Sequence, residues 1–190
     1  AGRNVCMGIG TTQTAGLCVG GLGAAGPGVT STESWNGSSW TEVNDLNTAN
    51  YEASSGGTQT SGIIVKQTNT EVWNGSSWTE TAESNTSRQT QSSSPSGASN
   101  SDMLYVGGTI PPATGATEYW NGTSWTELND LTTARYALNT GATAGATAAL
   151  AVGGYSPTTG ATEEWTITAT TFSKLTEGQL YFNSTTNTFK

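Results

Sequence analysis

The stretch "WNGSSW" at residues 35–40 returns unchanged at residues 73–78, and "WNGTSW" stands at residues 120–125. Six of the seven tryptophans in this chain of 190 residues therefore lie in three copies of one phrase. Each phrase follows a Thr-Glu-x triplet, and a fourth such triplet precedes Trp165. The first Trp of each unit recurs after 38, 47 and 45 residues. A fixed period of this length is typical of repeat architectures built from one supersecondary unit.

Two further landmarks recur upstream of the phrase. An apolar run ends in Gly-Gly at residues 17–21, 104–108 and 150–154, and "IIVKQ" at residues 63–67 takes its place in the second unit. Arg3, Arg88 and Arg135 stand 17 to 19 residues before the Gly pair, and Asn50 holds this position in the second unit. The landmarks divide residues 1–175 into four modules, approximately 3–46, 50–84, 88–131 and 135–175, followed by a tail at 176–190.

Each module predicts four short strands. The apolar run lacks alternation, which indicates a strand buried on both faces. Asn-Gly inside the phrase predicts a tight hairpin between the third and fourth strands, in which both residues tolerate a positive φ. The two Trp that flank this turn are expected to bury a large area against neighbouring modules. Residues 176–190 predict a C-terminal hairpin or a linker tail.

A repeated four-stranded unit that is apolar on both faces predicts an all-β fold, a β-propeller of four-stranded antiparallel blades. Double glycine after an apolar strand, followed by an aromatic residue and a Trp, resembles the kelch repeat of galactose-oxidase-type propellers. Three segments resemble sequences of kelch-like repeat proteins of marine tailed phages, cyanophages above all. These segments are "ATEEW", "WNGTSWTELNDLTTARYALNTGATAGATAALAVGGYSP" and "EGQLYFNSTTNTFK". Four blades is a small number for a closed ring. Three arrangements are therefore open: the four modules close by themselves, further modules belong to the ring, or other copies of the chain complete it.

The phage resemblance implies a non-enzymatic virion structural protein in a tail fibre, a spike or a capsid decoration. Such a protein serves assembly, host-surface recognition or both, and its location is the virion. Its partners would be other virion proteins or further copies of itself, and a glycan or protein of the host surface. A bacterial or secreted surface adhesin that binds glycans is the main alternative, and a propeller-class hydrolase is the less favoured one.

The amino-acid composition limits the kinds of ligand and reaction that we expect for this chain. The net charge is −8 with six basic residues, so no basic stripe is present to bind nucleic acid. No apolar run approaches the roughly 18 residues that a membrane span requires, so no membrane insertion is expected. The chain contains no histidine, which removes the commonest general base and metal ligand. We therefore expect no catalytic residues, no cofactor and no metal, and the copper chemistry of galactose oxidase does not carry over.

The remaining candidate residues have structural or recognition roles. Three Glu lie 28 to 30 residues after the repeated Arg, and Glu71 persists where Asn50 replaces the Arg, which predicts Arg–Glu pairing within or between blades. The expected structural repeat positions are Arg3, Arg88, Arg135, Glu33, Glu71, Glu118, Glu163, Trp35, Trp40, Trp73, Trp78, Trp120, Trp125 and Trp165.

Recognition is expected in the variable loops between the second and third strands, because variable loops on a repeated scaffold commonly carry binding. The candidate residues are Ile110, Pro111, Pro112, Tyr155 and Pro157. The alternative interpretation is that these loops only connect strands and bind no partner. Cys6 and Cys18 lie on opposite sides of the first predicted hairpin. They form either a cross-strand disulfide or two free thiols, and the sequence leaves both alternatives open.

Overall fold

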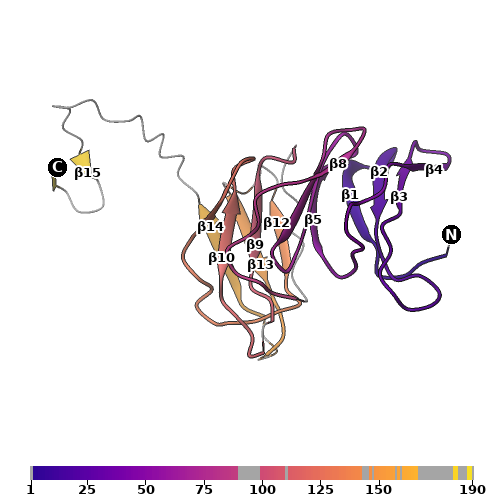
Figure 1. Ribbon diagram of the computed structural model, residues 1–190. Helices are drawn as coiled ribbons and strands as arrows, with labels where there is room; N and C mark the ends of the chain where they lie inside the picture. The colour runs from indigo at the N-terminus through magenta and orange to yellow at the C-terminus, as the bar shows by residue number, and fades with distance from the viewer. Residues whose placement is uncertain are drawn as a thin grey trace.

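The computed structural model describes residues 2–89, 99–109, 111–142, 146, 148–156, 158, 160–166, 182–183 and 188–189. All regular secondary structure in this part of the chain is β-strand (Figure 1). The strands are β1 (Met7–Thr12), β2 (Ala15–Val19), β3 (Thr32–Trp35), β4 (Trp40–Val43), β5 (Ser54–Thr58), β6 (Ser61–Lys66), β7 (Asn69–Trp73), β8 (Trp78–Glu80), β9 (Met103–Val106), β10 (Thr117–Trp120), β11 (Trp125–Glu127), β12 (Asn139–Ala142), β13 (Ala148–Val152), β14 (Thr162–Thr166), β15 (Phe182–Asn183) and β16 (Thr188–Phe189). No helix with the length and apolar composition of a membrane span occurs among the described residues.

The strands form antiparallel sheets that follow the modules. Sheet 1 has the order β1-β2-β3-β4 and sheet 2 the order β5-β6-β7-β8. Sheet 3 (β9 to β11) and sheet 4 (β12 to β14) each contain three described strands, and β15 pairs with β16. The predicted all-β fold of antiparallel sheets is confirmed. The first strand predicted for the third module and the fourth strand predicted for the last fall at residues 90–98 and after 166, outside the described residues.

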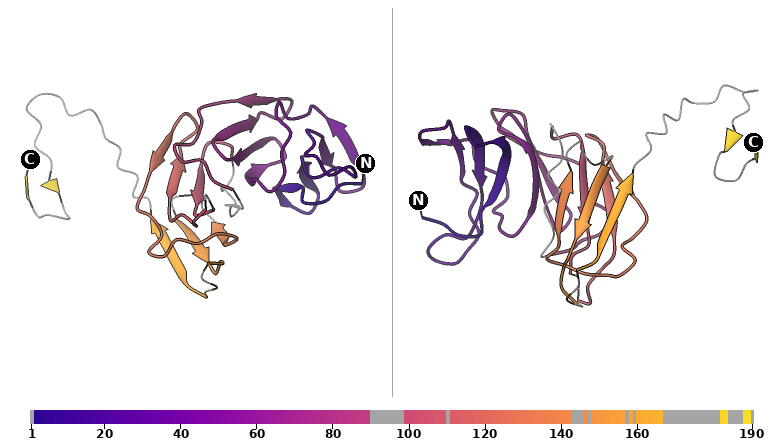
Figure 2. Two further views of the ribbon diagram at one scale, coloured as in Figure 1. Left: turned by 60° about the horizontal axis from the view of Figure 1, so that its bottom comes forward. Right: turned by 180° about the vertical axis from the view of Figure 1, so that it is seen from behind.

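The sheets stack face to face in chain order. Figure 2 shows them as a succession that does not close, with sheet 1 at one end and sheet 4 at the other. The first strands of the two leading modules approach each other, because Ser55 in β5 donates its hydroxyl to the carbonyl oxygen of Gly8 in β1 at 3.1 Å. Sheets 1 and 2 therefore touch along their first strands as well as through the apolar side chains between them.

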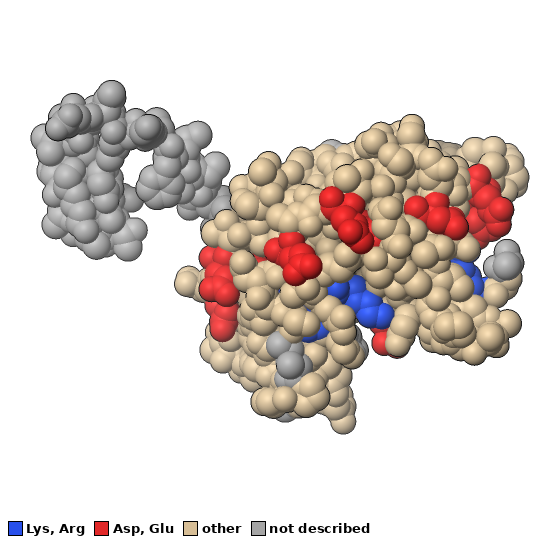
Figure 3. Space-filling view, in the orientation of Figure 1, with Lys and Arg blue, Asp and Glu red and all other residues tan. Residues whose placement is uncertain are grey.

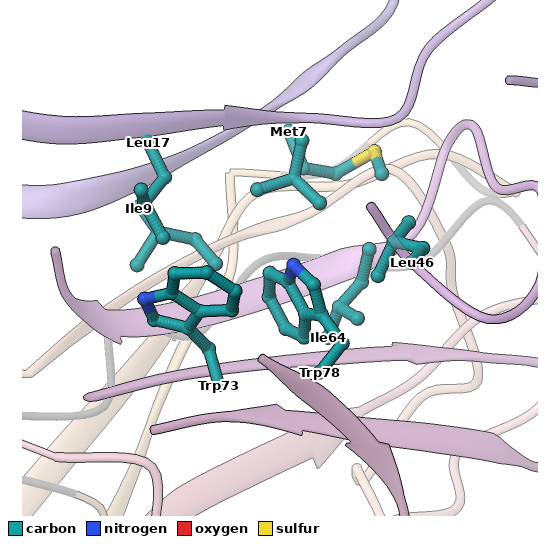
Figure 4. Close-up of a cluster of buried hydrophobic side chains, with 8 residues drawn as sticks. Met7, Ile9, Leu17, Leu46, Ile64, Trp73 and Trp78 are labelled. Carbon is teal, nitrogen blue, oxygen red and sulfur yellow. The ribbon is translucent and has the colours of Figure 1, made fainter. Parts of the chain in front are cut away.

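Three apolar clusters fill the spaces between successive sheets. The cluster between sheets 1 and 2 appears in Figure 4 and contains Met7, Ile9, Leu17, Val19, Leu46, Ile64, Trp73 and Trp78. The cluster between sheets 2 and 3 contains Ile63, Val65, Met103, Tyr105, Trp120 and Trp125. The cluster between sheets 3 and 4 contains Leu104, Val106, Leu131, Leu138, Ala146, Ala149 and Ala151.

The second strand of an inner module serves two clusters at once. In β6, Ile64 belongs to the cluster against sheet 1, whereas Ile63 and Val65 belong to the cluster against sheet 3. All three side chains are fully buried. This is the strand buried on both faces that an apolar run without alternation predicts, because successive side chains of a strand point to opposite faces.

The Trp pairs connect neighbouring sheets. Trp73 and Trp78 face each other across β7 and β8, with ring centroids 5.4 Å apart and planes inclined at 42°. Trp78 also donates its indole N–H to the hydroxyl of Thr32 in sheet 1 at 3.1 Å. Trp125 makes the same bond, at 3.1 Å, to Thr70 in sheet 2. The second Trp of a module thus packs on the preceding sheet and satisfies its one polar group there.

The turn between the two Trp differs from the prediction. Four residues separate Trp35 from its cross-strand partner Trp40. The side-chain Oδ1 of Asn36 accepts the backbone N–H groups of Ser38 and Ser39 at 2.9 and 3.0 Å. Within this described turn only the glycine, at residue 37, has a positive φ, of 93°. The expectation of a positive φ at both residues is wrong, because Asn contributes a side-chain acceptor instead of an unusual backbone conformation.

The double glycine permits a close approach between modules. Gly20 has a φ of 57°, and a Cβ at this position would lie 2.4 Å from the carbonyl oxygen of Asn50. The neighbouring Gly21 donates its N–H to that same oxygen at 2.7 Å. Gly107 and Gly108 meet the carbonyl oxygen of Arg135 in the same way. The end of each second strand is therefore tied to the start of the next module.

The burial of the Trp pair predicts unequal effects of one substitution at two repeat positions. Trp78→Ala is expected to lower the free energy of unfolding by about 3–5 kcal/mol, since it empties a closely packed site. Trp40→Ala is the matched control and is expected to cost clearly less, because Trp40 is 50% exposed and Trp78 only 5%. Urea unfolding at low protein concentration measures both, and equal losses would contradict the packing described.

Candidate functional site

Arginine and glutamate pair within three of the four modules. Each Arg enters from the segment before the first strand, and each Glu lies in the third strand of the same module. The nitrogen–oxygen distances are 2.8 Å for Arg3–Glu33, 2.9 Å for Arg88–Glu118 and 2.5 Å for Arg135–Glu163. The pairing that the sequence spacing predicts is present, and it lies within modules, not between them.

Backbone groups complete each pair. Arg88 donates to the carbonyl oxygen of Tyr105 in the second strand at 2.8 Å. Glu118 accepts the backbone N–H groups of Asn85 and Thr86 at 2.6 and 3.1 Å. The ion pair therefore fastens the segment that enters the module to its second and third strands. These hydrogen bonds offset part of the desolvation of the two charges and give the Arg and Glu a structural role.

The middle pair is the most deeply buried. The side chains of Arg88 and Glu118 are both 0% exposed, and the Arg88 guanidinium carbon lies 3.8 Å from the ring centroid of Tyr105. Burial lowers the pKa of Arg88, against the opposing effects of Tyr105 and Glu118. Burial likewise raises the pKa of the Tyr105 hydroxyl. The cost of removing one partner is therefore greatest here.

Replacement of this arginine gives a direct test. Arg88→Ala leaves the buried Glu118 carboxylate without its cation and is expected to lower the free energy of unfolding by about 3–5 kcal/mol. Arg3→Ala is the control and is expected to cost less, because the Glu33 side chain in that pair is 21% exposed. Chemical denaturation compares the two variants. An Arg88→Ala chain as stable as the original would rule out a stabilising role for the pair.

The second module departs from the pattern. Glu71 accepts three hydrogen bonds from the preceding connection: the N–H and side-chain amide of Asn47, both at 2.9 Å, and the N–H of Thr48 at 3.1 Å. The Asn47 amide thus takes the place of the guanidinium. Asn50, at the Arg position, is 1% exposed, and its Oδ1 atom makes no hydrogen bond.

A recess lies beside Asn50. The loop after β6 is short, since β6 ends at Lys66 and β7 begins at Asn69. A space of about 270 Å³ is lined by Thr48, Ala49, Asn50, Tyr51, Glu52, Lys66, Gln67, Asn69 and Gln89. A second space of about 310 Å³ is lined by Ser87, Arg88, Gln89, Thr109 and Pro111. Because Gln89 lines both, we treat them as one feature and call it the module 2 recess.

The module 2 recess offers hydrogen-bonding groups beside an aromatic ring. The Lys66 ammonium lies 3.4 Å from the ring centroid of Tyr51, and burial lowers its pKa while the nearby Glu52 opposes this effect. The Oδ1 atoms of Asn50 and Asn69 are buried and make no hydrogen bond. Figure 3 shows basic groups at an indentation in one face of the molecule, with an acidic group beside them and separate acidic patches above them and toward the edges of that face. The exposed Gln89 amide and the Lys66 ammonium beside the Tyr51 ring together suit a ligand rich in hydroxyl groups.

The predicted recognition residues are only partly placed at this recess. Pro111 lines it and Pro112 follows through a cis peptide bond, and both are exposed. Tyr155 is 56% exposed and packs edge-on against Tyr136, with centroids 5.4 Å apart, in the last module. Ile110 and Pro157 lie outside the described residues, as does the side chain of Trp165. Among the described residues, no group of three or more Cys, Asp or Glu side chains could hold a metal ion.

Sequence reasoning missed the lining residues Tyr51, Lys66 and Gln89. Two signals in the second module marked the place: the loss of Arg at position 50 and the shortened loop after residue 66. Each is visible in the sequence as a departure from the repeat. That the two departures meet beside one another depends on the fold, because their residues belong to different connections.

Cys6 and Cys18 lie together in sheet 1. Their sulfur atoms are 2.8 Å apart and both thiols are free. Burial raises the pKa of the Cys18 thiol, an effect that the hydrogen bond with Cys6 reinforces.

Oxidised glutathione is expected to join these two thiols, forming one sulfur–sulfur bond and releasing two glutathione thiols. The closed loop restricts the unfolded chain and is expected to stabilise the fold by about 3 kcal/mol. Intact-mass spectrometry detects the loss of two hydrogens, and thermal unfolding detects the stabilisation. The Cys18→Ser control should show neither change, and a chain that keeps both thiols under oxidation would contradict the expectation.

Comparison with known proteins adds information on the fold. No family model matches the chain, and no curated protein matches it. Among solved structures 114 chains match. One is the structure of YjhT, with a TM-score of 0.62 and 10% sequence identity over 80% of this chain. The chain spans 59% of the length of that structure. At this identity the likeness shows a shared fold alone.

Proposed function

We propose that the four modules are kelch-like blades of a β-propeller and that the chain is a non-enzymatic virion protein of a tailed phage. It would stand in a tail fibre, a spike or a capsid decoration and recognise the host surface. The repeated Trp phrase, the Gly-Gly ends and the buried Arg–Glu pairs support the blade assignment, since each recurs at one repeat position in three of the four modules. The phage assignment rests on the resemblance of the repeat sequences to kelch-like repeat proteins of tailed phages.

The module 2 recess carries the recognition part of the proposal. It lies where the second module departs from the other three, and Gln89 connects its two parts. The exposed Gln89 amide in its lining both donates hydrogen bonds to hydroxyl groups and accepts them. The ligand class that fits is a carbohydrate of the host surface, with the ring of Tyr51 and the stem of Lys66 forming the apolar side of the contact.

A glycan array screened with the purified chain tests this function. Binding to a bacterial surface glycan is expected, with Tyr51→Ala and Gln89→Ala each weakening it about tenfold or more, the effect of losing one good polar or aromatic contact. Thr126→Ala is the control, because Thr126 is an exposed polar residue that does not line the recess. Unchanged binding in both recess variants would refute the assigned site.

The virion location has its own test. Mass spectrometry of purified phage particles should detect the chain among the structural proteins. Detection on the bacterial surface in cells free of phage would favour a surface adhesin with the same blades. Turnover of a polysaccharide by the purified chain would contradict the non-enzymatic role.

A further inference from the structure

The first two interfaces between sheets share one construction. One side presents two apolar residues from the second strand of a sheet, and the other side presents the Trp pair of the following sheet. At the first interface the members are Leu17 and Val19 with Trp73 and Trp78. At the second interface they are Ile63 and Val65 with Trp120 and Trp125.

Two kinds of hydrogen bond accompany this packing at both interfaces. The second Trp of the following sheet donates to a Thr of the preceding one, as Trp78 does to Thr32 and Trp125 to Thr70, each at 3.1 Å. A side-chain amide of the following module also donates to the carbonyl oxygen of the first Trp before it. These bonds join Gln59 to Trp35 at 2.6 Å and Asn100 to Trp73 at 2.9 Å.

Sheet 1 exposes one half of this interface. Trp40 is 50% exposed, Trp35 is half-buried, and Gln13, at the position of Gln59 and Asn100, is exposed. These residues correspond to the groups with which sheets 2 and 3 cover the sheet before them.

Sheet 4 exposes the other half. Leu150 and Val152 hold the positions of Leu17 and Val19, yet they are 40% and 42% exposed. Thr162 holds the position of Thr32 and is exposed, whereas Thr32 is 0% exposed beneath Trp78. The two ends of the stack therefore carry complementary faces that lie apart in the chain (Figure 1).

We propose that these faces join copies of the chain head to tail, with Trp35 and Trp40 of one copy packed on Leu150 and Val152 of a second copy. In the register of the internal interfaces, the Trp40 indole N–H donates to the Thr162 hydroxyl. The Gln13 side-chain amide donates to the carbonyl oxygen of Trp165. Association buries the apolar end faces, which drives it.

A second copy is the occupant because the same chain carries both halves, and because each half continues a packing pattern that the chain already builds twice. The two faces differ, so the contact is heterologous. Repetition of such a contact forms a ring if the rotation closes and an open array if it does not. The inference is independent of what the module 2 recess binds, since no residue of that recess belongs to either end face.

Size-exclusion chromatography with light scattering on the full chain tests the proposal. The mass is expected to rise above that of the monomer as concentration increases. Trp40→Lys and Val152→Lys should each stay monomeric, and at low protein concentration both should lose less thermal stability than Trp78→Ala, because about half of each side chain is exposed. Tyr155→Lys is the matched control: it changes an exposed apolar residue outside both faces and should associate like the original chain.

Mixing the two monomeric variants gives the sharper result. The Trp40→Lys chain keeps an intact sheet 4 face and the Val152→Lys chain keeps an intact sheet 1 face. An equal mixture should therefore form dimers of one copy each and stop at two copies. An original chain that stays monomeric at about 1 mM, where even weak specific contacts are populated, would overturn the proposal. A mixture that stays monomeric, or loss of association in Tyr155→Lys, would overturn the assigned faces.

Discussion

Stacking of one sheet on the next through a pair of indoles is the contact on which the structure depends. A single sheet of three or four short strands cannot bury both of its apolar faces, so each module needs a neighbour. The paired Trp supply a wide apolar surface, and the indole N–H of the second one finds a Thr hydroxyl in the preceding sheet. Because sheets 2 and 3 both make this contact with the sheet before them, the stack of described sheets has two different ends, where Trp40, Leu150 and Val152 are 50%, 40% and 42% exposed.

The buried ion pairs have a separate task. They hold each incoming segment in place against the second and third strands, where a misplaced connection would shift the register of the next sheet. Desolvation makes such pairs costly unless the charges are hydrogen-bonded, and the backbone N–H groups of Asn85 and Thr86 supply such bonds to the Glu118 carboxylate. The second module shows the alternative: Asn47 bonds Glu71 in place of the cation, and the space no longer filled by a guanidinium borders the recess. Structural regularity and the candidate binding site are thus connected, since the site lies where the regularity fails.

Much of this arrangement was predictable from the repeat. The period, the strands buried on both faces and the Arg–Glu partners all follow from residues at constant spacing, because side chains at equivalent repeat positions meet equivalent surroundings. The turn conformation was predicted wrongly, since Asn36 can act through its backbone or through its side-chain oxygen and the sequence does not distinguish the two. The recess was missed because its lining residues come from four connections that only the fold brings together.

The sequence by itself determined the modular all-β architecture, since alternation, turn residues and repeated landmarks are local properties that short segments express alone. Only the tertiary structure decided which Trp pair is covered and which is exposed. Trp40 and Trp78 stand in identical phrases, yet one is 50% and the other 5% exposed. The difference arises because burial depends on whether a neighbouring sheet lies against that face, and no local pattern within residues 35–40 or 73–78 records the presence of that neighbour.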